Sequence, residues 1–372
     1  MSKENLDLKP LIKIVSDGSP LTEEQSKEAF DIIMTGNATP SQIGGFLMAM
    51  RVRGETTEEI TGAALSMREK VIIITAPFGA IDTVGTGGDA SGTFNISTAS
   101  SFIVSAAGVP VAKHGNKALS SKTGAADVLS QLGVNLDCDL SVVQKAMDEI
   151  GICFLMAPRH HMAMRHVAAS RSELGTRTIF NILGPLANPA LVTKQLVGVF
   201  SESWVEPMAW VLKSLGCETA WVVHGSDGLD EITTTGFTKV AALDKGDITT
   251  FSLHAGDAAI ELAQRKDLKG GLPKQNAEAL LNLLKGEKGA YRDIVVFNSA
   301  AALIIAGKVN TLKEGAKLAA DMIDNGQAKQ KLDQLNLFAS LYKATTEQKI
   351  QKTGALDTLK EQTPFVNVTP RE

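Results

Sequence analysis

The pattern of apolar and polar positions divides the chain into a helical opening, a middle part of alternating strands and helices, and a helical end. In roughly the first 70 residues, each short helix begins with a threonine followed three residues later by Glu or Gln, which is typical of a capping box. Gly36 and Gly54 stand where two of these helices are expected to end. The three capping boxes are Thr22 with Gln25, Thr39 with Gln42 behind Pro40, and Thr56 with Glu59. The opening is therefore predicted to be a small all-helical unit.

From residue 71 onward, short apolar or β-branched runs alternate with helical stretches. Such alternation predicts an α/β domain with a mainly parallel central sheet. The predicted strands lie at residues 71–74, 82–84, 109–112, 196–199, 221–223 and 294–296, and the helical stretches include 97–107 and 125–132. Ligands of such sheets bind at the carboxyl ends of the strands, so we expect the functional site at that edge.

The last third of the chain is again predicted to be helical. A capping box is expected at Thr311 with Glu314, and a polar tail follows from about residue 349, in which 363–366 is a candidate edge segment. Residues 175–189 are rich in turn formers, so the chain is expected to cross between domains there. With 372 residues and 44% hydrophobic composition, the chain is long enough for more than one core.

Composition argues against several classes of protein. The formal net charge is −4, the isoelectric point is near 5.9 and aromatic residues make up 5%, so a nucleic-acid binder with a basic face and stacking aromatics is not expected. Cys138, Cys153 and Cys217 have neither metal-site spacing nor the density of a disulfide framework, and we expect reduced thiols. The sequence shows no signal segment and no apolar run of membrane-spanning length, which predicts a soluble cytoplasmic protein without membrane attachment.

One long segment is free of acidic residues. Residues 90–126, 37 in number, contain no Asp or Glu although the chain as a whole is acidic. A glycine cluster precedes this acid-free segment, and basic side chains lie within it. They are Gly85, Gly87 and Gly88, and Lys113, His114, Lys117 and Lys122. Because glycines let backbone N–H groups approach phosphate oxygens and lysines neutralise their charge, the pattern predicts a site for a highly anionic small molecule.

Residues 82–100, DTVGTGGDASGTFNISTAS, predict a strand, a glycine turn and a helix start crowded with hydroxyl and amide side chains. Free backbone N–H groups at such a helix start form a cradle for anions. One alternative is a glycine turn that binds nothing. Another is a dinucleotide site, because residues 85–90 fit G-x-G-x-x-A. That site needs an acidic residue about 20 positions further on, and the acid-free segment supplies none, so a nicotinamide enzyme is disfavoured.

A basic segment, residues 113–124, is the second candidate. It has the sequence KHGNKALSSKTG and lies between a predicted strand and a predicted helix. Its three lysines, one histidine and two adjacent serines suit a phosphate or diphosphate group, whereas the alternative is a solvated basic loop. Because this loop and the glycine turn follow successive strands, we favour the phosphate site.

Acidic residues return at 224–231, HGSDGLDE, directly after a predicted strand. Mg²⁺ usually takes one or two carboxylates and completes its coordination with substrate phosphates and water. Asp230 and Glu231 are therefore candidate metal ligands, with a solvated acidic pair as the alternative. Their position at a strand's carboxyl end favours the metal site.

Four arginines, Arg159, Arg165, Arg171 and Arg177, recur every six residues, which spreads them around a helix. Most are therefore expected to be surface charges. Arg171 precedes the turn-rich crossing segment, where its guanidinium can reach a carboxylate substrate through two hydrogen bonds.

Taken together, these segments resemble the anthranilate phosphoribosyltransferase family. The matching motifs are GTGGD at 85–89, NIST at 95–98, KHGNKALSS at 113–121, RTIFNILGPLANP at 177–189 and HGSDGLDE at 224–231, in the order and spacing of that family. The likeness extends from about residue 21 to residue 334.

The resemblance implies a homodimer whose subunits have a small helical domain, residues 1–72 with 172–190, and a larger α/β domain, residues 73–171 with 191–372. The active site would lie in the cleft between them. The implied reaction transfers the phosphoribosyl group of 5-phosphoribosyl diphosphate to the amine of anthranilate and releases diphosphate, in tryptophan biosynthesis. Mg²⁺ is the implied cofactor.

The resemblance also implies which residues bind each substrate. For 5-phosphoribosyl diphosphate they are Gly85, Gly88, Asp89, Thr93, Asn95, Ser97, Thr98, Lys113, His114, Gly115, Asn116, Lys117, Ala118, Leu119, Ser120, Ser121 and Ala125. For anthranilate they are Gly85, Asn116, His114, His161, Pro185 and Arg171, the last through the substrate's carboxylate. Ser97, Asp230 and Glu231 would hold Mg²⁺. No nucleophilic side chain is implied, and catalysis would rest on positioning and electrostatics.

Two positions depart from the family pattern. Lys117 stands where Arg is common and keeps the positive charge, and Met162 follows His161 where Pro is frequent, which could alter the anthranilate channel. Two alternatives stay open. A pyrimidine nucleoside phosphorylase shares the two-domain plan, but it resembles this chain poorly at the glycine turn and lacks a KHGN loop. A non-catalytic or nucleic-acid-binding relative should lose parts of GTGGD or the acidic pair.

Overall fold

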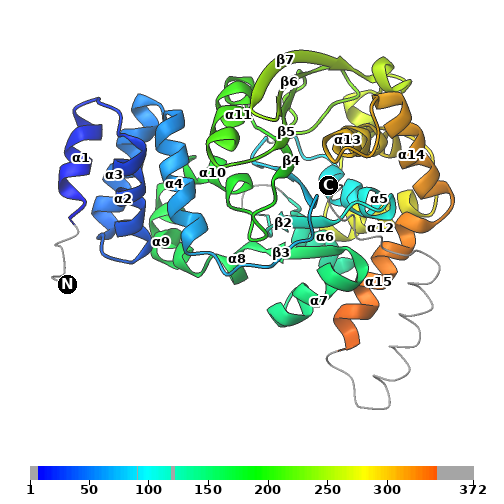
Figure 1. Ribbon diagram of the computed structural model, residues 1–372, viewed down its shortest axis with the longest axis horizontal. Helices are drawn as coiled ribbons and strands as arrows, with labels where there is room; N and C mark the ends of the chain where they lie inside the picture. The colour runs from blue at the N-terminus through cyan, green and yellow to red at the C-terminus, as the bar shows by residue number, and fades with distance from the viewer. Residues whose placement is uncertain (1–6, 90, 119–121, 342–372) are drawn as a thin grey trace.

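The structure, a computed structural model, describes residues 7–89, 91–118 and 122–341 (Figure 1). It opens with the helices α1 (Lys9–Ser16), α2 (Glu23–Met34), α3 (Pro40–Arg53) and α4 (Thr57–Glu69). The capping boxes predicted for α2, α3 and α4 are all formed, with side chain and backbone bonded in both directions. The helical opening is therefore confirmed, and Figure 1 shows it gathered at one side of the molecule.

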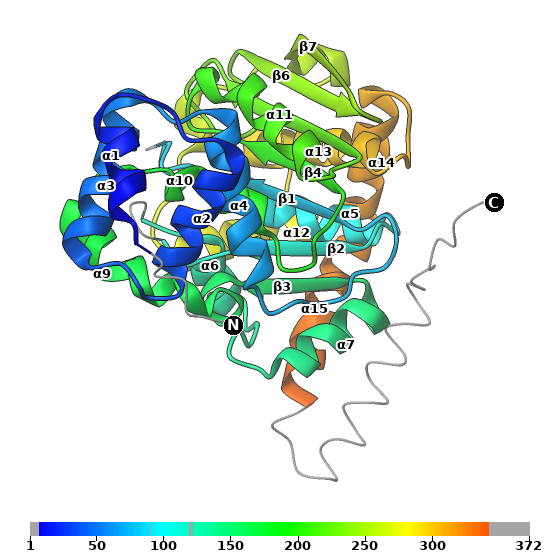
Figure 2. The ribbon, with the colours of Figure 1, turned by 60° about the vertical axis from the view of Figure 1, so that its left-hand side comes forward.

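The central sheet has seven strands in the order β3-β2-β1-β4-β5-β6-β7. They are β1 (Ile81–Gly85), β2 (Val111–Gly115), β3 (Ile152–Met156), β4 (Lys194–Gly198), β5 (Thr219–Gly225), β6 (Phe237–Asp244) and β7 (Asp247–His254). Figure 2 shows β3, β2, β1 and β4 following one another, with β6 and β7 beyond them. Pairing is parallel from β3 through β5 and antiparallel for β6 and β7. The mainly parallel sheet is confirmed.

Two predicted strands are wrong. Residues 71–74 form an extended connection in which Ile72 N–H donates to His160 and Ile74 N–H to Pro189, and no ladder forms. Residues 294–296 lie in the helix α13 (Ala290–Ile305), which is buried on nearly every side. A helix that is apolar all round has no polar face to reveal its period, so a short β-branched run within it reads as a strand. The strands β3, β6 and β7 were not predicted, and β2 begins two residues later than expected.

Further helices surround the sheet. They are α5 (Ile96–Ala106), α6 (Ala125–Gln131), α7 (Leu140–Ile150), α8 (Ala157–His160), α9 (Arg165–Leu174), α10 (Phe180–Leu183), α11 (Val205–Ser214), α12 (Pro273–Leu284), α14 (Leu312–Asp324) and α15 (Gln327–Leu341). The capping box predicted at Thr311 with Glu314 starts α14. The predicted polar tail lies outside the described residues. Among the helices described, none is both long and apolar enough to cross a membrane.

The sheet separates two hydrophobic cores. Leu196 and Val223 face the core that contains α5 and α13. Their chain neighbours, Val197 and Val222, face the core shared with α11 and with the opening helices α2, α3 and α4. Burial on both faces explains why these strands are continuous apolar runs rather than alternating ones. The helical opening joins this core through α4, which packs against α11, and α9 and α10 complete the core.

Candidate functional site

The predicted site residues gather at the carboxyl ends of the parallel strands. Gly85 ends β1 and is the register partner of Gly198, which ends β4 on the neighbouring strand. Gly115 ends β2 on the other side of β1. The glycine turn, the basic segment and the acidic pair therefore meet at one edge of the sheet, as predicted for an α/β fold.

Asp230 lies across the ends of β1 and β4. Its Oδ2 accepts a hydrogen bond of 2.7 Å from the backbone N–H of Gly87. A Cβ at Gly85 would lie 2.4 Å from that same Oδ2, and a Cβ at Gly198 would lie 1.6 Å from the backbone oxygen of Asp230. Only glycine at both strand ends admits the acidic residue. Gly198 was not among the predicted site residues, since a lone glycine ending a strand carries no signal of its own.

Glu231 binds the start of α5. The backbone N–H of Ser97, in the first turn of that helix, donates to Glu231 Oε1 at 3.2 Å. The expectation of free N–H groups at this helix start is thus wrong for Ser97. The acidic pair, which is far away in sequence, directly contacts both the glycine turn and the helix that were expected to receive phosphate. A helix N-terminus favours such a negative charge.

Lys113 lies in β2, not in the loop where the sequence had placed it, and it is only 3% exposed. Its Nζ donates to the backbone oxygen of Thr83 at 2.6 Å and to Ser97 Oγ at 3.3 Å. Burial lowers the pKa of Lys113, while the neighbouring charges of Asp82 and Glu231 act to raise it. The sheet therefore fixes the lysine beneath the site, where the neighbouring acidic groups favour its charged form.

The two acidic side chains are buried next to each other and to Asp89, which disfavours their ionised forms. Burial, and then the charge of Asp89, raise the pKa of Asp230 to about 7. Burial, and then the charge of Asp230, raise the pKa of Glu231 to about 8, although Lys113 acts to lower it. Buried carboxyl oxygens whose ionisation lacks a compensating positive charge fit a hard divalent cation, which would supply that charge. Ser97 Oγ, beside Lys113, adds a neutral oxygen to this donor set.

No group of three or more His, Cys, Asp or Glu side chains with metal-site geometry occurs within the described ranges. Mg²⁺ commonly binds one or two protein carboxylates and takes its other ligands from substrate phosphates and water. Asp230 and Glu231 provide two carboxylates and leave the other coordination positions to substrate and water. This arrangement fits Mg²⁺, which rarely takes all its ligands from the protein.

The loop after β2 is folded back by an acidic residue just beyond the acid-free segment. Asp127 Oδ2 accepts hydrogen bonds of 2.9 Å from the backbone N–H groups of Ala118 and Gly124. The N–H of Lys117 donates to the side chain of the preceding asparagine at 2.8 Å. The described part of the loop thus presents the exposed side chains of Lys117 and Lys122 over a pinned backbone. The predicted phosphate ligands Leu119, Ser120 and Ser121 lie outside the described residues.

The segment 91–95 is held by residues that sequence analysis missed. Asn95 Oδ1 accepts from Asn276 Nδ2 at 2.9 Å, and Tyr291 Oη donates to the backbone oxygen of Asn95 at 3.1 Å. Thr93 forms an isolated bridge with Lys269. The side chain of Asn95, predicted to bind substrate, therefore already has a protein partner. The helix-start hydroxyl of Thr98 is buried without a hydrogen-bond partner.

Two buried histidines pack together near the crossing segment. The rings of His114 and His161 lie 5.2 Å apart, and His114 Nδ1 lies 3.2 Å from the backbone oxygen of Gly184. Because a carbonyl only accepts, Nδ1 of His114 carries the proton and its Nε2 is an acceptor. Burial lowers the pKa of His114 to about 3 and that of His161 to about 4. Both rings are neutral at neutral pH, and both Nε2 atoms are buried without a partner.

Arg171 lies in α9 with its guanidinium carbon 5.1 Å above the ring of Phe180, so a cation–π contact orients it. Burial lowers its pKa. Pro185 is buried behind the histidines, where its backbone oxygen accepts from Gln195 at 2.9 Å. These contacts leave the guanidinium without a carboxylate partner among the ion pairs of the described residues.

Arg177, one of the four arginines expected mostly at the surface, is exposed and also joins the two parts of the molecule. Its guanidinium lies 4.3 Å from the ring centroid of Phe200 and donates to the backbone oxygen of Gly88 in the glycine turn. Arg51 of α3 donates in turn to the backbone oxygen of Arg177. Such contacts between distant segments leave no local sequence signal.

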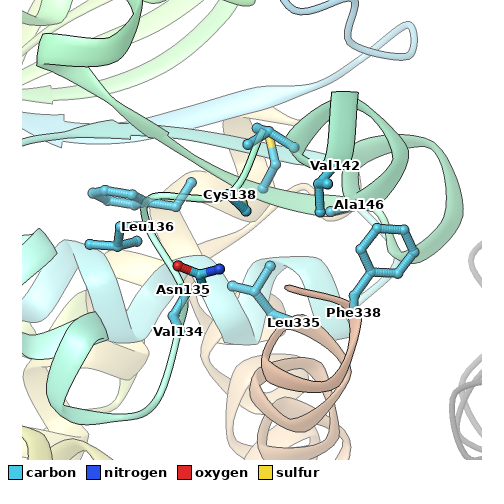
Figure 3. A pocket seen from close by; sticks show the side chains of 11 residues that line it. Val134, Asn135, Leu136, Cys138, Val142, Ala146, Leu335 and Phe338 are labelled. Carbon is cyan, nitrogen blue, oxygen red and sulfur yellow. The ribbon is translucent and has the colours of Figure 1, made fainter. Parts of the chain in front are cut away.

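An apolar cavity lies elsewhere, between α7, α15 and residues 134–138 (Figure 3). Its lining includes Cys138, Cys153 and Phe338, and none of the predicted binding residues. Burial raises the pKa of the Cys153 thiol, so it is unreactive as a nucleophile.

Comparison with known proteins matches both parts of the chain. Residues 78–329 match the family described as "Glycosyl transferase family, a/b domain", and residues 9–71 match "Glycosyl transferase family, helical bundle domain". An anthranilate phosphoribosyltransferase from Paramagnetospirillum magneticum is 60% identical over 328 residues, covering 88% of this chain and 95% of that protein. A second, from Rhodospirillum rubrum, is 60% identical over 326 residues, covering 88% and 94%.

Solved structures agree with the sequence relatives. The crystal structure of anthranilate phosphoribosyltransferase from Thermus thermophilus has a TM-score of 0.84 and 41% identity, covering 88% of this chain and 98% of that one. The enzyme from Saccharomyces cerevisiae in complex with PRPP and Mg has a TM-score of 0.82 and 28% identity, covering 91% and 99%.

Proposed function

The chain belongs to the anthranilate phosphoribosyltransferase family, and on that premise we propose how its residues share the work of the reaction. The enzyme transfers the phosphoribosyl group of 5-phosphoribosyl diphosphate to the amine of anthranilate, giving N-(5-phosphoribosyl)anthranilate and diphosphate, in tryptophan biosynthesis. It is a glycosyltransferase that uses Mg²⁺. The observation that carries our assignment of roles is the direct contact of the acidic pair with the glycine turn and the start of α5.

The phosphates of 5-phosphoribosyl diphosphate bind along the glycine turn, the first turn of α5 and the loop after β2. Backbone N–H groups near Gly88 and the hydroxyl of Thr98 supply donors, and Lys113 supplies positive charge from below. Lys117 is exposed at the loop and can turn toward the diphosphate. The acid-free segment thus lines the most anionic part of the substrate.

Asp230, Glu231 and Ser97 Oγ hold Mg²⁺, which when bound neutralises negative charge on the diphosphate. The support is the placement of the two carboxyls at the glycine turn and the start of α5, together with raised pKa values that show that their ionisation lacks a compensating positive charge. With the cation bound, the two carboxylates would be ionised and would hold the cation at the edge of β1 and β4, where it would receive the diphosphate end of the substrate. No covalent intermediate with a side chain is needed, because the amine attacks the ribose carbon directly.

Anthranilate binds between Arg171 and the two buried histidines. The guanidinium of Arg171 pairs with the substrate's carboxylate, and the partnerless Nε2 atoms of His114 and His161 accept hydrogen bonds from its amine. Asn116 and Pro185 line the approach. Neutral histidines suit this role because a protonated ring would repel the amine's hydrogens and could not accept them.

We also propose a homodimer in the cytoplasm, with no nucleic-acid partner and no membrane attachment. Support for the dimer comes from the family resemblance. We likewise propose that residues 1–72 with 172–190 form the helical domain and residues 73–171 with 191–372 form the α/β domain. Sedimentation of the purified chain tests the oligomeric state.

Anthranilate fluorescence gives the direct test of the function. The signal should fall when 5-phosphoribosyl diphosphate and Mg²⁺ are added together to the protein with anthranilate, and should persist when either is left out. An unchanged signal with folded protein would overturn the assignment. Phosphate-dependent cleavage of thymidine, assayed alongside, would then reveal a nucleoside phosphorylase.

A further inference from the structure

Asn298 hydrogen-bonds to the backbone of Ile232, the residue that follows the acidic pair. This asparagine lies on α13 and is fully buried. Its Nδ2 donates to the backbone oxygen of Ile232 at 2.8 Å, and its Oδ1 accepts from the backbone N–H of the same residue at 3.0 Å. Nδ2 also donates to the backbone oxygen of Ile294 at 2.8 Å. One carboxamide thus satisfies both backbone groups of Ile232, much as a neighbouring strand would.

Asp227 closes the same segment from the other side. Its Oδ2 accepts from the hydroxyls of Thr233 at 2.7 Å and Thr235 at 2.5 Å. Its Oδ1 accepts from the backbone N–H of Leu229 at 3.3 Å, and its backbone oxygen accepts from Arg265 at 2.5 Å. The carboxylate therefore ties a residue before the acidic pair to residues after it, which closes the segment into a loop.

The acidic pair needs such support for a geometric reason. Asp230 and Glu231 are adjacent, yet one carboxylate reaches the glycine turn and the other reaches the start of α5. Like charges held at this range repel each other in a buried site. Small movements of the backbone would separate the two oxygens from a shared cation, because Mg²⁺ demands near-ideal ligand geometry.

We propose that Asn298 and Asp227 are positioning residues, which act through Ile232 and Thr233 to fix the backbone of Asp230 and Glu231 for Mg²⁺. The inference rests on the proposed metal site. Neither side chain is among the residues that we place against substrate. Their role is to set the affinity for the cation rather than to react.

The principal variant is Asn298→Asp, which keeps the size of the side chain and the acceptor for Ile232 N–H but loses the two donated bonds. Asn336→Asp is the matched control, because Asn336 Nδ2 also donates to a backbone oxygen, that of Leu132 at 2.8 Å, on a helix far along the chain from the acidic pair. Asp227→Asn is the second variant, at a half-buried turn where folding is less at risk.

Mg²⁺ is titrated into steady-state assays at saturating anthranilate. For Asn298→Asp and Asp227→Asn we expect the half-saturating Mg²⁺ concentration to rise at least about tenfold, with the KM for anthranilate changed less than about twofold. Asn336→Asp should lose thermal stability but keep the wild-type Mg²⁺ dependence. Unchanged Mg²⁺ dependence in both folded variants would overturn the proposal.

Mn²⁺ binding, followed by electron paramagnetic resonance in the presence of diphosphate, gives a readout independent of turnover. Binding to the wild type and to Asn336→Asp should be equal, and binding to Asn298→Asp at least about fivefold weaker. If Asn298→Asp binds Mn²⁺ more weakly than the wild type but the wild type does not convert anthranilate, the proposed function fails while the positioning role stands. Equal Mn²⁺ affinity in all the variants would refute the positioning role whatever the substrate.

Discussion

The backbone carbonyl oxygen of Asp230 lies so close to Gly198 that a Cβ on the glycine would stand 1.6 Å from it. Gly198 ends β4, and Asp230 follows β5. Because glycine has no Cβ, the backbone of Asp230 can pass directly against the end of β4. Because the obstructing atom is backbone, the clash cannot be relieved by turning a side chain.

Gly198→Ala is therefore expected to displace Asp230 and to abolish most activity. Overpacking of this kind costs about 1–3 kcal/mol of unfolding free energy, and we expect turnover to fall by at least about 100-fold. Urea unfolding and steady-state assays measure the two effects. Gly256→Ala is the control, because Gly256 is exposed and a Cβ there meets no atom within 4 Å. Near-normal turnover in Gly198→Ala would show that the acidic backbone can move freely.

The double variant Asp230→Asn with Glu231→Gln should lose turnover by roughly 10²–10³-fold while gaining stability without metal. In the folded protein the pKa values of Asp230 and Glu231 are about 7 and about 8, above those of the unfolded chain. The wild type therefore loses unfolding free energy as pH rises from the unfolded pKa values to the folded ones. The metal-free variant should thus exceed the wild type in unfolding free energy near about pH 9, with the difference shrinking toward about pH 4. Wild-type rates at saturating Mg²⁺ would contradict the metal assignment.

Arg171→Ala should act on one substrate only. Loss of a charge-assisted pair with the anthranilate carboxylate, worth about 1.5–3 kcal/mol, predicts a KM for anthranilate raised roughly 10- to 150-fold. The KM for 5-phosphoribosyl diphosphate should change less than about threefold. Arg165→Ala on the same helix is the control, since Arg165 is exposed. An equal rise in both KM values would count against the assigned role.

Arg177→Lys should weaken the glycine turn. Lysine keeps the charge but cannot stack its planar group on Phe200 while donating to Gly88, so we expect the KM for 5-phosphoribosyl diphosphate to rise about 5- to 20-fold. Initial rates at varied concentrations of each substrate measure this. Arg165→Lys should leave both KM values as they are, and a normal KM in Arg177→Lys would mean that the turn holds its shape without the contact.

His161 should make the protein sensitive to acid. In the folded protein the pKa of His161 is about 4, below the ordinary 6.5. Between these two values the unfolded chain binds a proton at this ring and the folded protein does not, so the unfolding free energy falls as pH drops below 6.5. Relative to His161→Asn, the wild type should lose about 2 kcal/mol more unfolding free energy between about pH 7.5 and about pH 5. Urea unfolding of both proteins at the two pH values measures the difference, in which the contributions of the other titrating groups cancel. Equal losses would mean that the ring accepts a proton in the folded state.

Local signals predicted local structure well. The capping boxes beginning at Thr22, Thr39, Thr56 and Thr311 formed because each depends on residues three apart. The run at 294–296 misled because burial on every side removes helical periodicity. Strand β3 and the antiparallel pair β6 and β7 went unpredicted, since nothing local states where a strand will pair.

The site was predictable where residue type alone indicates chemistry. The glycine turn, the basic segment and the acidic pair were found as separate motifs, yet their contacts were not, because they join residues more than 130 positions apart. Gly198, Asn276 and Arg177 were missed for the same reason, as each acts through a distant partner. Lys113 was assigned to a loop because the end of β2 was placed too early.

The core shared by the helical opening and the back of the sheet also bears on how the chain is made. Phe30 packs edge-on against Phe180 at 5.5 Å, and Leu243, at the end of β6, belongs to the same core. On the ribosome, the first four helices emerge long before these partners are synthesised. Their capping boxes can hold nascent helical turns, and the shared core is complete only once most of the sheet has been translated.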